Sequence, residues 1–224
     1  VDKDDYIKVV DQCYMCDLCY MTKCPYVPPH EWNVDFPHLM LRAKAQRYKN
    51  EGASFRDNLL TSTDMVGKLA TIPVVDVTVN AFNNNGLFRN ALESTLGVHK
   101  EAPLPEYHSK TLRKQFVSDT ITPKPVGRTT GKVAFYATCY GNYNTPHLGE
   151  DFSTVFRHNG IHMELVTKEA CCGMPKFELG DLDSVHKLKE KNIPVLAKLV
   201  DEGFDFTAPI PSCVLMYKQE LPLL

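Results

Sequence analysis

The sequence predicts an α+β protein in which a helical first half precedes a smaller α/β half built around a short parallel sheet. Three observations predict this. Residues 4–96 show apolar side chains at helical spacing, interrupted by proline and asparagine-glycine breaks. From residue 132 onward, short apolar runs alternate with helical segments, a pattern typical of parallel strands joined by right-handed crossovers. A polar stretch rich in proline separates the two halves.

Five helices are expected in the first half, at residues 4–12, 36–49, 56–71, 74–82 and 87–96. Pro37 suits the first turn of the second helix, and Gly97 suits the end of the fifth. The third helix is expected to turn five apolar side chains inward, namely Leu59, Leu60, Met65, Val66 and Leu69. The apolar stretch 66–82 predicts core packing, with contact to a membrane surface or a partner as the alternative.

The second helix carries basic side chains that are expected to form a solvated face, with a docking surface as the alternative; they are Arg42, Lys44, Arg47 and Lys49.

The second half is expected to contain strands at residues 132–138, 161–166 and 204–210. Helices are expected at residues 148–158 and 183–202, the latter broken at Pro194. The stretch before residue 132 carries four prolines amid polar residues, which indicates a linker. The predicted division is a helical domain at 1–100, a linker at 101–131 and an α/β module at 132–224.

Four of the eight cysteines fall within twelve residues, as Cys13, Cys16, Cys19 and Cys24. A C-x-x-C-x-x-C run followed by Cys-Pro is typical of bacterial ferredoxins, whereas zinc sites usually show two separated pairs. The run therefore predicts a 4Fe-4S cluster, with structural zinc as the alternative. The spacer before Cys24 is one residue longer than the common one, which leaves open whether Cys24 closes this cluster or reaches a second one.

The other four cysteines follow the three predicted strands. Cys139 comes directly after the first strand, Cys171 and Cys172 follow the second with Gly173 next, and Cys213 follows the third. Because the carboxyl ends of parallel strands share one edge of a sheet, these thiols are expected to meet in space. A disulfide between adjacent cysteines is strained, whereas two thiolates suit a metal centre. The set predicts a second metal site, with free or redox-active thiols as the alternative.

Composition argues against several other classes of function. The 224-residue chain is 43% hydrophobic and 23% charged, with a formal net charge of -2, so a nucleic-acid partner is not expected. The sequence shows no targeting segment and no apolar run of membrane-spanning length, which predicts a cytoplasmic protein. It shows no glycine-rich phosphate loop, so neither flavin nor nicotinamide is expected on this chain. His147, His158 and His162 are expected to be ordinary surface or packing residues.

The arrangement of Cys139, Cys171-Cys172-Gly173 and Cys213 resembles the cysteine-rich CCG module of heterodisulfide reductase-related iron-sulfur oxidoreductases. The run from Cys13 to Pro25 matches the ferredoxin-type segment that precedes such modules, and the combination is most similar to the C subunits of anaerobic glycerol-3-phosphate dehydrogenases. The resemblance implies a ferredoxin-like helical part and a Rossmann-like module with a small parallel sheet.

The same resemblance implies an iron-sulfur electron-transfer subunit rather than a flavin enzyme. Electrons would pass between a flavin dehydrogenase or other redox subunit and a quinone or thiol/disulfide acceptor. Peripheral contact with the cytoplasmic face of the inner membrane is the accompanying expectation.

Three departures from that family bear on the cofactors. One ferredoxin motif and one CCG module are found where the family commonly has two of each, which predicts that the chain is a fragment, truncated within a longer relay. The fullest CCG modules close with C-x-x-C, whereas this chain reads Cys213-Val-Leu-Met216. The second site is therefore expected to hold an iron-sulfur cluster or zinc. Two other functions stay open, namely catalysis at the CCG site on a disulfide or thiol-linked substrate, and a structural zinc module used for assembly.

Overall fold

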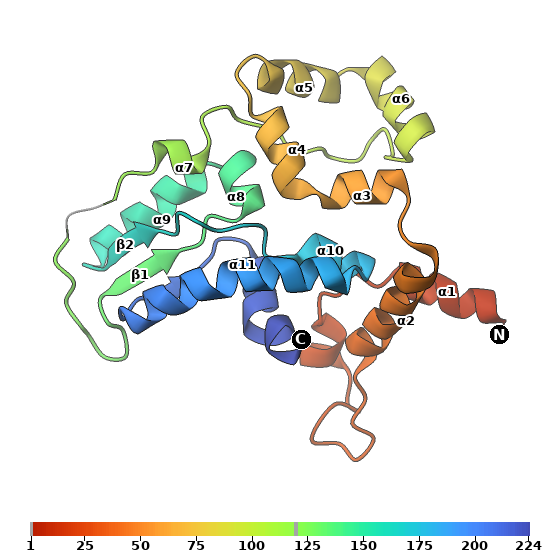
Figure 1. Ribbon diagram of the computed structural model, residues 1–224, viewed down its shortest axis with the longest axis horizontal. Coiled ribbons are helices and arrows are strands. Elements are labelled where there is room, and N and C mark those ends of the chain that lie inside the picture. Colours follow the sequence, from red (N-terminus) through yellow and green to blue (C-terminus); the bar gives the residue numbers. More distant parts are fainter. Residues whose placement is uncertain (1, 119–120) are drawn as a thin grey trace.

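The protein is described by a computed structural model that covers residues 2–118 and 121–224 (Figure 1). The predicted α+β class is confirmed, because helices surround one sheet of three short parallel strands in the order β2-β1-β3. β1 (Lys132–Phe135) lies between β2 (His162–Leu165) and β3 (Asp205–Thr207). Val133 pairs in register with Met163 on one side and with Asp205 on the other. The finer likeness to ferredoxin and Rossmann folds stays a prediction.

Four of the five helices expected in the first half are confirmed, and the third prediction is wrong. The confirmed helices are α1 (Lys3–Asp11), α2 (Phe36–Glu51), α5 (Val75–Asn83) and α6 (Gly86–Leu96). In place of one helix over 56–71, the chain forms α3 (Phe55–Thr61) and α4 (Thr63–Ala70). The break falls at Ser62, whose backbone leaves the helical region with a ψ of 55°.

This break also changes which side chains face inward. Leu60, Met65 and Leu69 were expected in the core, but each is about half exposed. Leu59 and Val66 are half-buried. The buried face of α4 consists of Gly67 and Ala70 instead. Gly67 has no side chain and Ala70 has only a methyl group, so α4 can approach its neighbours closely.

The second half contains several short helices that the sequence pattern did not reveal. These are α8 (Cys139–Tyr143), α10 (Met174–Leu179) and α12 (Pro211–Leu215), together with the π-helical turn η2 (Met216–Glu220) and the 3-10 turn η3 (Leu221–Leu223). Earlier in the chain, the π-helical turn η1 (Cys19–Lys23) and the short helix α7 (Leu112–Gln115) were not expected either. The predicted helices α9 (His147–His158) and α11 (Leu182–Asp201) are confirmed. The expected break at Pro194 is wrong, because α11 continues through it and buries Val185, Asn192 and Leu196.

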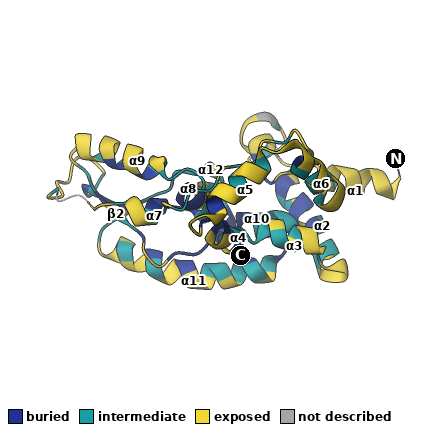
Figure 2. Ribbon diagram, turned by 90° about the horizontal axis from the view of Figure 1, so that it is seen from above, coloured by how far each residue is buried: buried dark blue, intermediate teal, exposed yellow. Residues whose placement is uncertain are grey.

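The two longest helices of this half lie on opposite faces of the sheet, α9 on one and α11 on the other (Figure 2). β1 supplies both layers, because successive strand residues point to opposite faces. Val133 and Phe135 pack with Leu112 and Met163 in a cluster that Phe152 of α9 joins. Alternate residues of the same segment enter the other, larger cluster.

That larger cluster joins the two halves of the chain. It contains Ala134 and Tyr136 from the sheet region, Phe177 from α10 and Leu196 from α11. Met15 from the first cysteine run is fully buried in it, and Met40 and Leu41 of α2 are also buried there. Both sets of cysteines therefore border one hydrophobic core. The division into domains at residues 101–131 stays a prediction.

Candidate metal centres

The first cysteine run is held in a tight, irregular loop after α1. Met15 and Asp17 adopt positive φ angles of 51° and 57°, which turn the chain between successive cysteines. Cys16 and Cys19 are exposed, whereas Cys13 and Cys24 are half-buried. The pKa of the Cys19 thiol is raised mainly by burial, and the nearby Cys13 and Cys16 raise it further. The structure thus brings three of the four thiols close enough to influence one another.

Cys24 is connected to this group through its backbone. Its N–H donates to the carbonyl oxygen of Cys19 at 2.8 Å, which closes the turn η1. The question of whether its thiol belongs to this cluster or to another therefore stays open.

Helix α2 contacts the cysteine run and the end of α1 through two basic side chains. The Lys44 ammonium is buried and donates to the carbonyl oxygen of Cys13 at 2.6 Å, and Arg47 pairs with Asp11 at 2.6 Å. The expectation that Lys44 lies on a solvated face is therefore wrong. Lys44 instead donates to a backbone carbonyl of the irregular loop, which helps to satisfy the hydrogen bonding of that loop.

Asp17 of the same loop belongs to a cluster of ionisable side chains with Asp35, His38 and Glu220. The His38 ring approaches Glu220 at 3.0 Å through Nε2 and Asp35 at 2.8 Å through Nδ1. Asp17 and Glu220 are buried and interact with each other. Burial raises the pKa of Asp17, and it raises the pKa of Glu220 to about 6 with the neighbouring Asp17 charge adding to the shift. For His38, the two carboxylates outweigh burial and raise its pKa.

The second set of cysteines is brought together as the sequence predicts. Cys139 begins α8 just after β1, Cys171 and Cys172 lie in the loop after β2, and Cys213 lies in α12 just after β3. All but Cys139, which is half-buried, are buried. Hydrogen bonds connect these thiols, with Cys139 and Cys172 as donors to Cys171 and with Cys172 also bonded to Cys213.

The hydrogen bonds concentrate negative charge on one of these four sulfurs. The thiols of Cys139 and Cys172 donate to Cys171, and the Thr63 hydroxyl lies 3.4 Å from its Sγ. Together they lower the pKa of Cys171 to about 3, although burial opposes this. The pKa values of Cys139 and Cys172 rise in consequence. The site stabilises a thiolate inside the protein, which is the form that binds metals.

Residues from two helices, α4 and α11, fix the backbone around Cys171. The Cys171 N–H donates to Asp64 Oδ2 of α4 at 2.7 Å. The Asn192 side chain of α11 accepts from the Ala170 N–H at 2.7 Å and donates to the Cys171 carbonyl at 3.0 Å. Gly173 follows with a φ of 99°, a conformation that suits glycine. The sequence does not predict a role for Thr63, Asp64 or Asn192, because no motif places them near the cysteines.

The donor set at the second site fits a cofactor that binds thiolates. Four sulfurs lie together, three of them buried, a chemistry that suits an iron-sulfur cluster or zinc. Among residues 2–118 and 121–224, no three His, Cys, Asp or Glu side chains are arranged as ligands of one metal ion. Met216, which stands where the fullest modules have a fifth cysteine, is fully buried in the core.

A cavity of about 320 Å³ opens beside the second site. Cys171 and Thr63 line it together with Lys176, Lys187 and Leu188. Cys171 therefore borders a cavity with room for a small molecule.

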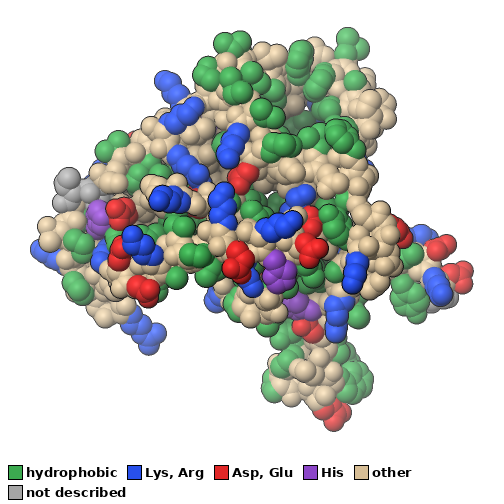
Figure 3. Space-filling model, viewed as in Figure 1, with side chains coloured by type: hydrophobic (Ala, Val, Ile, Leu, Met, Phe, Trp, Pro, Cys, Tyr) green, Lys and Arg blue, Asp and Glu red, His purple; other side chains and the backbone are tan. Residues whose placement is uncertain are grey.

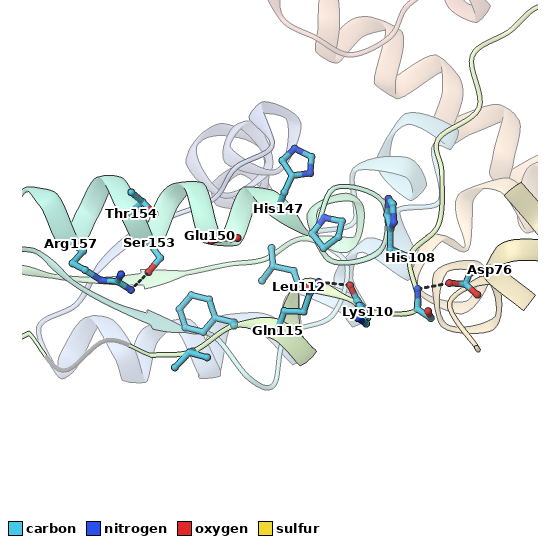
Figure 4. Close-up of a pocket in the computed structure, with 15 residues that line it drawn as sticks. Asp76, His108, Lys110, Leu112, Gln115, His147, Glu150, Ser153, Thr154 and Arg157 are labelled. Atoms are coloured by element: carbon cyan, nitrogen blue, oxygen red, sulfur yellow. Dashed lines mark hydrogen bonds between the residues drawn. The ribbon is translucent and has the colours of Figure 1, made fainter. Parts of the chain in front are cut away.

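A larger cavity of about 770 Å³ lies between α9 and the segment around α7 (Figure 4). His108, His147 and Arg157 line it, and Arg157 donates to Ser153 at 3.2 Å. None of the eight cysteines, all of which the structure describes, lines this cavity. His147 is exposed there, as expected for a surface residue.

Comparison with known proteins identifies the second half of the chain. Residues 133–217 match the family model of the cysteine-rich domain known as CCG. The second half of the chain is therefore similar to a CCG domain. The matched range spans Cys139, Cys171, Cys172 and Cys213, so the family assignment and the geometry concern the same four residues.

Three relatives extend the comparison. The C subunit of anaerobic glycerol-3-phosphate dehydrogenase from Escherichia coli is 28% identical over 191 residues, which cover 85% of this chain and 47% of that protein. The B subunit of the CoM/CoB fumarate reductase from Methanothermobacter marburgensis is 29% identical over 99 residues, or 43% of this chain and 19% of that protein. An uncharacterized iron-sulfur protein of Methanocaldococcus jannaschii is 31% identical over 68 residues, which cover 30% of this chain and 14% of that protein.

The chain spans about half the length of the Escherichia coli relative and less of the other two. No solved structure matches it. The resemblance to iron-sulfur proteins with a CCG domain is confirmed by these matches. The roles of the individual cysteines as ligands stay proposals.

Proposed function

We propose that the chain is the iron-sulfur part of an electron-transfer subunit. Cys13, Cys16, Cys19 and Cys24 would hold a 4Fe-4S cluster, and the four cysteines of the CCG domain a second centre. The observation that carries the proposal is that both cysteine sets border one hydrophobic core, in a chain whose relatives include iron-sulfur proteins. Such clusters supply one-electron transfer over a wide range of potentials.

The chain's own residues would tune the two centres differently. Cys16 and Cys19 are exposed, so the first centre is open to water and to a partner surface. The CCG cysteines are mostly buried, and Thr63 and Asp64 bond to Cys171 and hold its backbone and sulfur in place. Burial and hydrogen bonds to sulfur are the means by which a protein sets cluster potential.

The partners follow from the relatives' names, which are subunits of a dehydrogenase and of a reductase. We propose a flavin dehydrogenase or another redox subunit on one side, and a quinone or a thiol/disulfide compound on the other. A cytoplasmic location with peripheral contact to the inner membrane belongs to the same proposal.

Anaerobic purification followed by metal and sulfide analysis tests this function. Iron and sulfide in comparable amounts, with a paramagnetic signal on reduction that disappears when the purified partner complex reoxidises the protein, would support electron transfer. About two zinc ions per chain without iron would contradict it and favour the assembly module.

A second candidate function is catalysis at the CCG site, favoured by the cavity beside Cys171. A disulfide or thiol-linked substrate entering there would approach the Cys171 sulfur. If a disulfide substrate alters the signal of the second centre, and if the protein reduced beforehand by a chemical reductant supplies the two electrons that cleave it to two thiols without a partner subunit, catalysis is the better account. If the signal is unchanged, the site serves as a relay.

A further inference from the structure

Arg113 of α7 lies in the stretch that the sequence predicts to be a linker, and outside residues 133–217 that match the CCG family model. Its segment is nevertheless fixed to the second half of the chain. α7 contacts α8 and α9 (Figure 1), and Leu112 is buried in the cluster around β1. The Arg113 N–H donates to Oδ1 of Asn142 at 3.0 Å. Asn142 belongs to α8, so the backbone of Arg113 is held by the helix that Cys139 begins.

The guanidinium of Arg113 reaches a second segment that carries CCG cysteines. It pairs with Glu169, whose side chain is 1% exposed and which lies two residues before Cys171. The charge of Arg113 also acts on Asp64, whose Oδ2 accepts from the Cys171 N–H at 2.7 Å. Arg113 therefore interacts with the carboxyl groups that approach Cys171 from α4 and from the loop after β2.

The surroundings of the second site are rich in groups that can carry negative charge. Four cysteine sulfurs lie together there, and three of these cysteines are buried. The carboxyl groups of Asp64 and Glu169 lie next to them. Negative charge that is removed from water is costly unless an opposite charge or hydrogen bonds compensate it. A cation among these groups is therefore a functional part of the site.

The lysines around the site are placed differently from Arg113. Lys and Arg side chains are spread over the face of the molecule shown in Figure 3, where water and salt screen their charges. Lys68 and Lys187 are exposed in this way, and Lys176 lies 3.9 Å from Asp181. Arg113 is half-buried, pairs with a carboxyl group next to the cysteines, and stays positively charged at every working pH.

We propose that Arg113 is a positioning residue of the second centre and that its charge raises the reduction potential of that centre. A cation at this place stabilises the reduced form, because the electron taken up adds negative charge where burial makes charges interact strongly. The inference rests on the proposed iron-sulfur centre and deepens it, since it names a residue outside the cysteine motif that sets its potential. It also makes the predicted linker a part of the site.

A redox titration followed by paramagnetic resonance tests this proposal, with variants made in a Glu169→Gln background. This background is needed because Glu169, left unpaired in the interior, takes up a proton and so offsets the loss of the arginine charge. Adding Arg113→Gln is expected to lower the potential of the second centre by about 59 mV, which corresponds to a tenfold change in the equilibrium constant of a one-electron reduction. Adding Arg113→Lys instead should keep the potential of the background, because lysine supplies the same charge.

Lys114→Gln in the same background is the matched control, because Lys114 is the next residue of α7 and is exposed. It should leave the potential of the second centre unchanged, and the potential of the first centre should be the same in all variants. An unchanged potential after Arg113→Gln overturns the inference. A fall of equal size in Arg113→Lys and Arg113→Gln overturns it too, because the effect would then come from packing rather than charge.

Iron analysis of the same samples covers the case in which a variant fails to assemble the second centre. Loss of iron in Arg113→Gln with retention in Arg113→Lys supports the role of the charge, whereas loss in both overturns it. The wild type separates this inference from the electron-transfer proposal. A wild-type protein without iron overturns both, and a protein that holds iron but shows no effect of the Arg113 charge overturns this inference alone.

Discussion

At the scale of single residues, the CCG site depends on side chains that reach it from other parts of the chain. Thr63 and Asp64 lie more than 100 residues before Cys171, yet both bond to it. Hydrogen bonds to sulfur stabilise the more negative form of a centre, which makes that centre easier to reduce.

Replacing Thr63 by valine removes the hydroxyl while keeping the shape of the side chain. We expect the reduction potential of the second centre to fall, by an amount corresponding to about 1.5 kcal/mol for one charge-assisted hydrogen bond. A redox titration followed by paramagnetic resonance would measure this. Thr61→Val is the control, because Thr61 borders the same cavity but its hydroxyl bonds to Asp57. Equal shifts in both variants would contradict the assignment.

The cluster of Asp17, Asp35, His38 and Glu220 predicts how stability depends on pH. Folding raises the pKa of Glu220 from 4.5 to about 6, so the folded protein holds this proton more tightly than the unfolded chain does. The contribution of Glu220 to the free energy of unfolding is complete below pH 4.5 and is lost as the pH rises through about 6. The raised pKa values of Asp17 and His38 change the stability in the same direction. The free energy of unfolding should therefore fall by up to about 2 kcal/mol over this range.

Glu220→Gln should flatten this pH dependence, because glutamine stays neutral at every pH. Urea unfolding at several pH values between about 5 and 7.5 would measure the slope. Glu150→Gln, on an exposed part of α9, should keep the slope of the wild type. An unchanged slope in Glu220→Gln would show that Glu220 does not titrate in this range.

The eight cysteines could be assigned to two groups from the sequence, because spacing and strand order are local signals. Their supporting residues could not. In the sequence, Lys44 is one of several basic residues on a predicted helix, and Asn192 is one polar residue within α11, so neither stands out. Both become parts of a site only when segments distant in the sequence pack together, as Lys44 does against the Cys13 carbonyl.

At the scale of elements, close approach of helices positions α4 beside the CCG site. A Cβ atom added at Gly67 would come within 2.5 Å of Cε2 of the Tyr143 ring in α8. Because of this contact α4 can present Thr63 and Asp64 to Cys171. Sequence periodicity predicted one helix where α3 and α4 lie, since the break at Ser62 involves neither proline nor glycine.

Gly67→Ala should destabilise the protein, although alanine usually favours a helix. We expect a loss of about 1–3 kcal/mol from overpacking against Tyr143. Gly86→Ala is the control, since a Cβ atom there meets nothing within 4 Å, and it should be neutral or slightly stabilising. Thermal or urea unfolding of both variants would measure these changes in stability. A Gly67→Ala protein as stable as the wild type would contradict the packing described for α4.

The short helices α8, α10 and α12 show why element boundaries were harder to predict than element order. Each begins after a strand or after the loop that follows one. A helix of five or six residues is too short for its period to be recognised in the sequence. α11, in contrast, continues through Pro194 because one face of the helix is buried along its length. Tertiary packing overrides local preference in both cases.

At the scale of the whole molecule, the shared core predicts that both cysteine sets fold together. Met15 is fully buried in the cluster that includes Cys171, Cys172 and Cys213. Met15→Ala should lower the free energy of unfolding by about 2–4 kcal/mol. Fluorescence of Trp32, which stacks on Tyr26 in the first half, and circular dichroism should report one common transition. Two separate transitions would contradict a shared core.

The central claim is that the two groups of cysteines hold two separate iron-sulfur centres. Paramagnetic resonance of the reduced protein, compared among the wild type, Cys16→Ser and Cys172→Ser, tests this most directly. The account predicts two signals in the wild type, loss of one signal in Cys16→Ser, loss of the other in Cys172→Ser, and a matching fall in iron in each variant. A protein that contains zinc without iron, or the loss of the same signal in both variants, would contradict it.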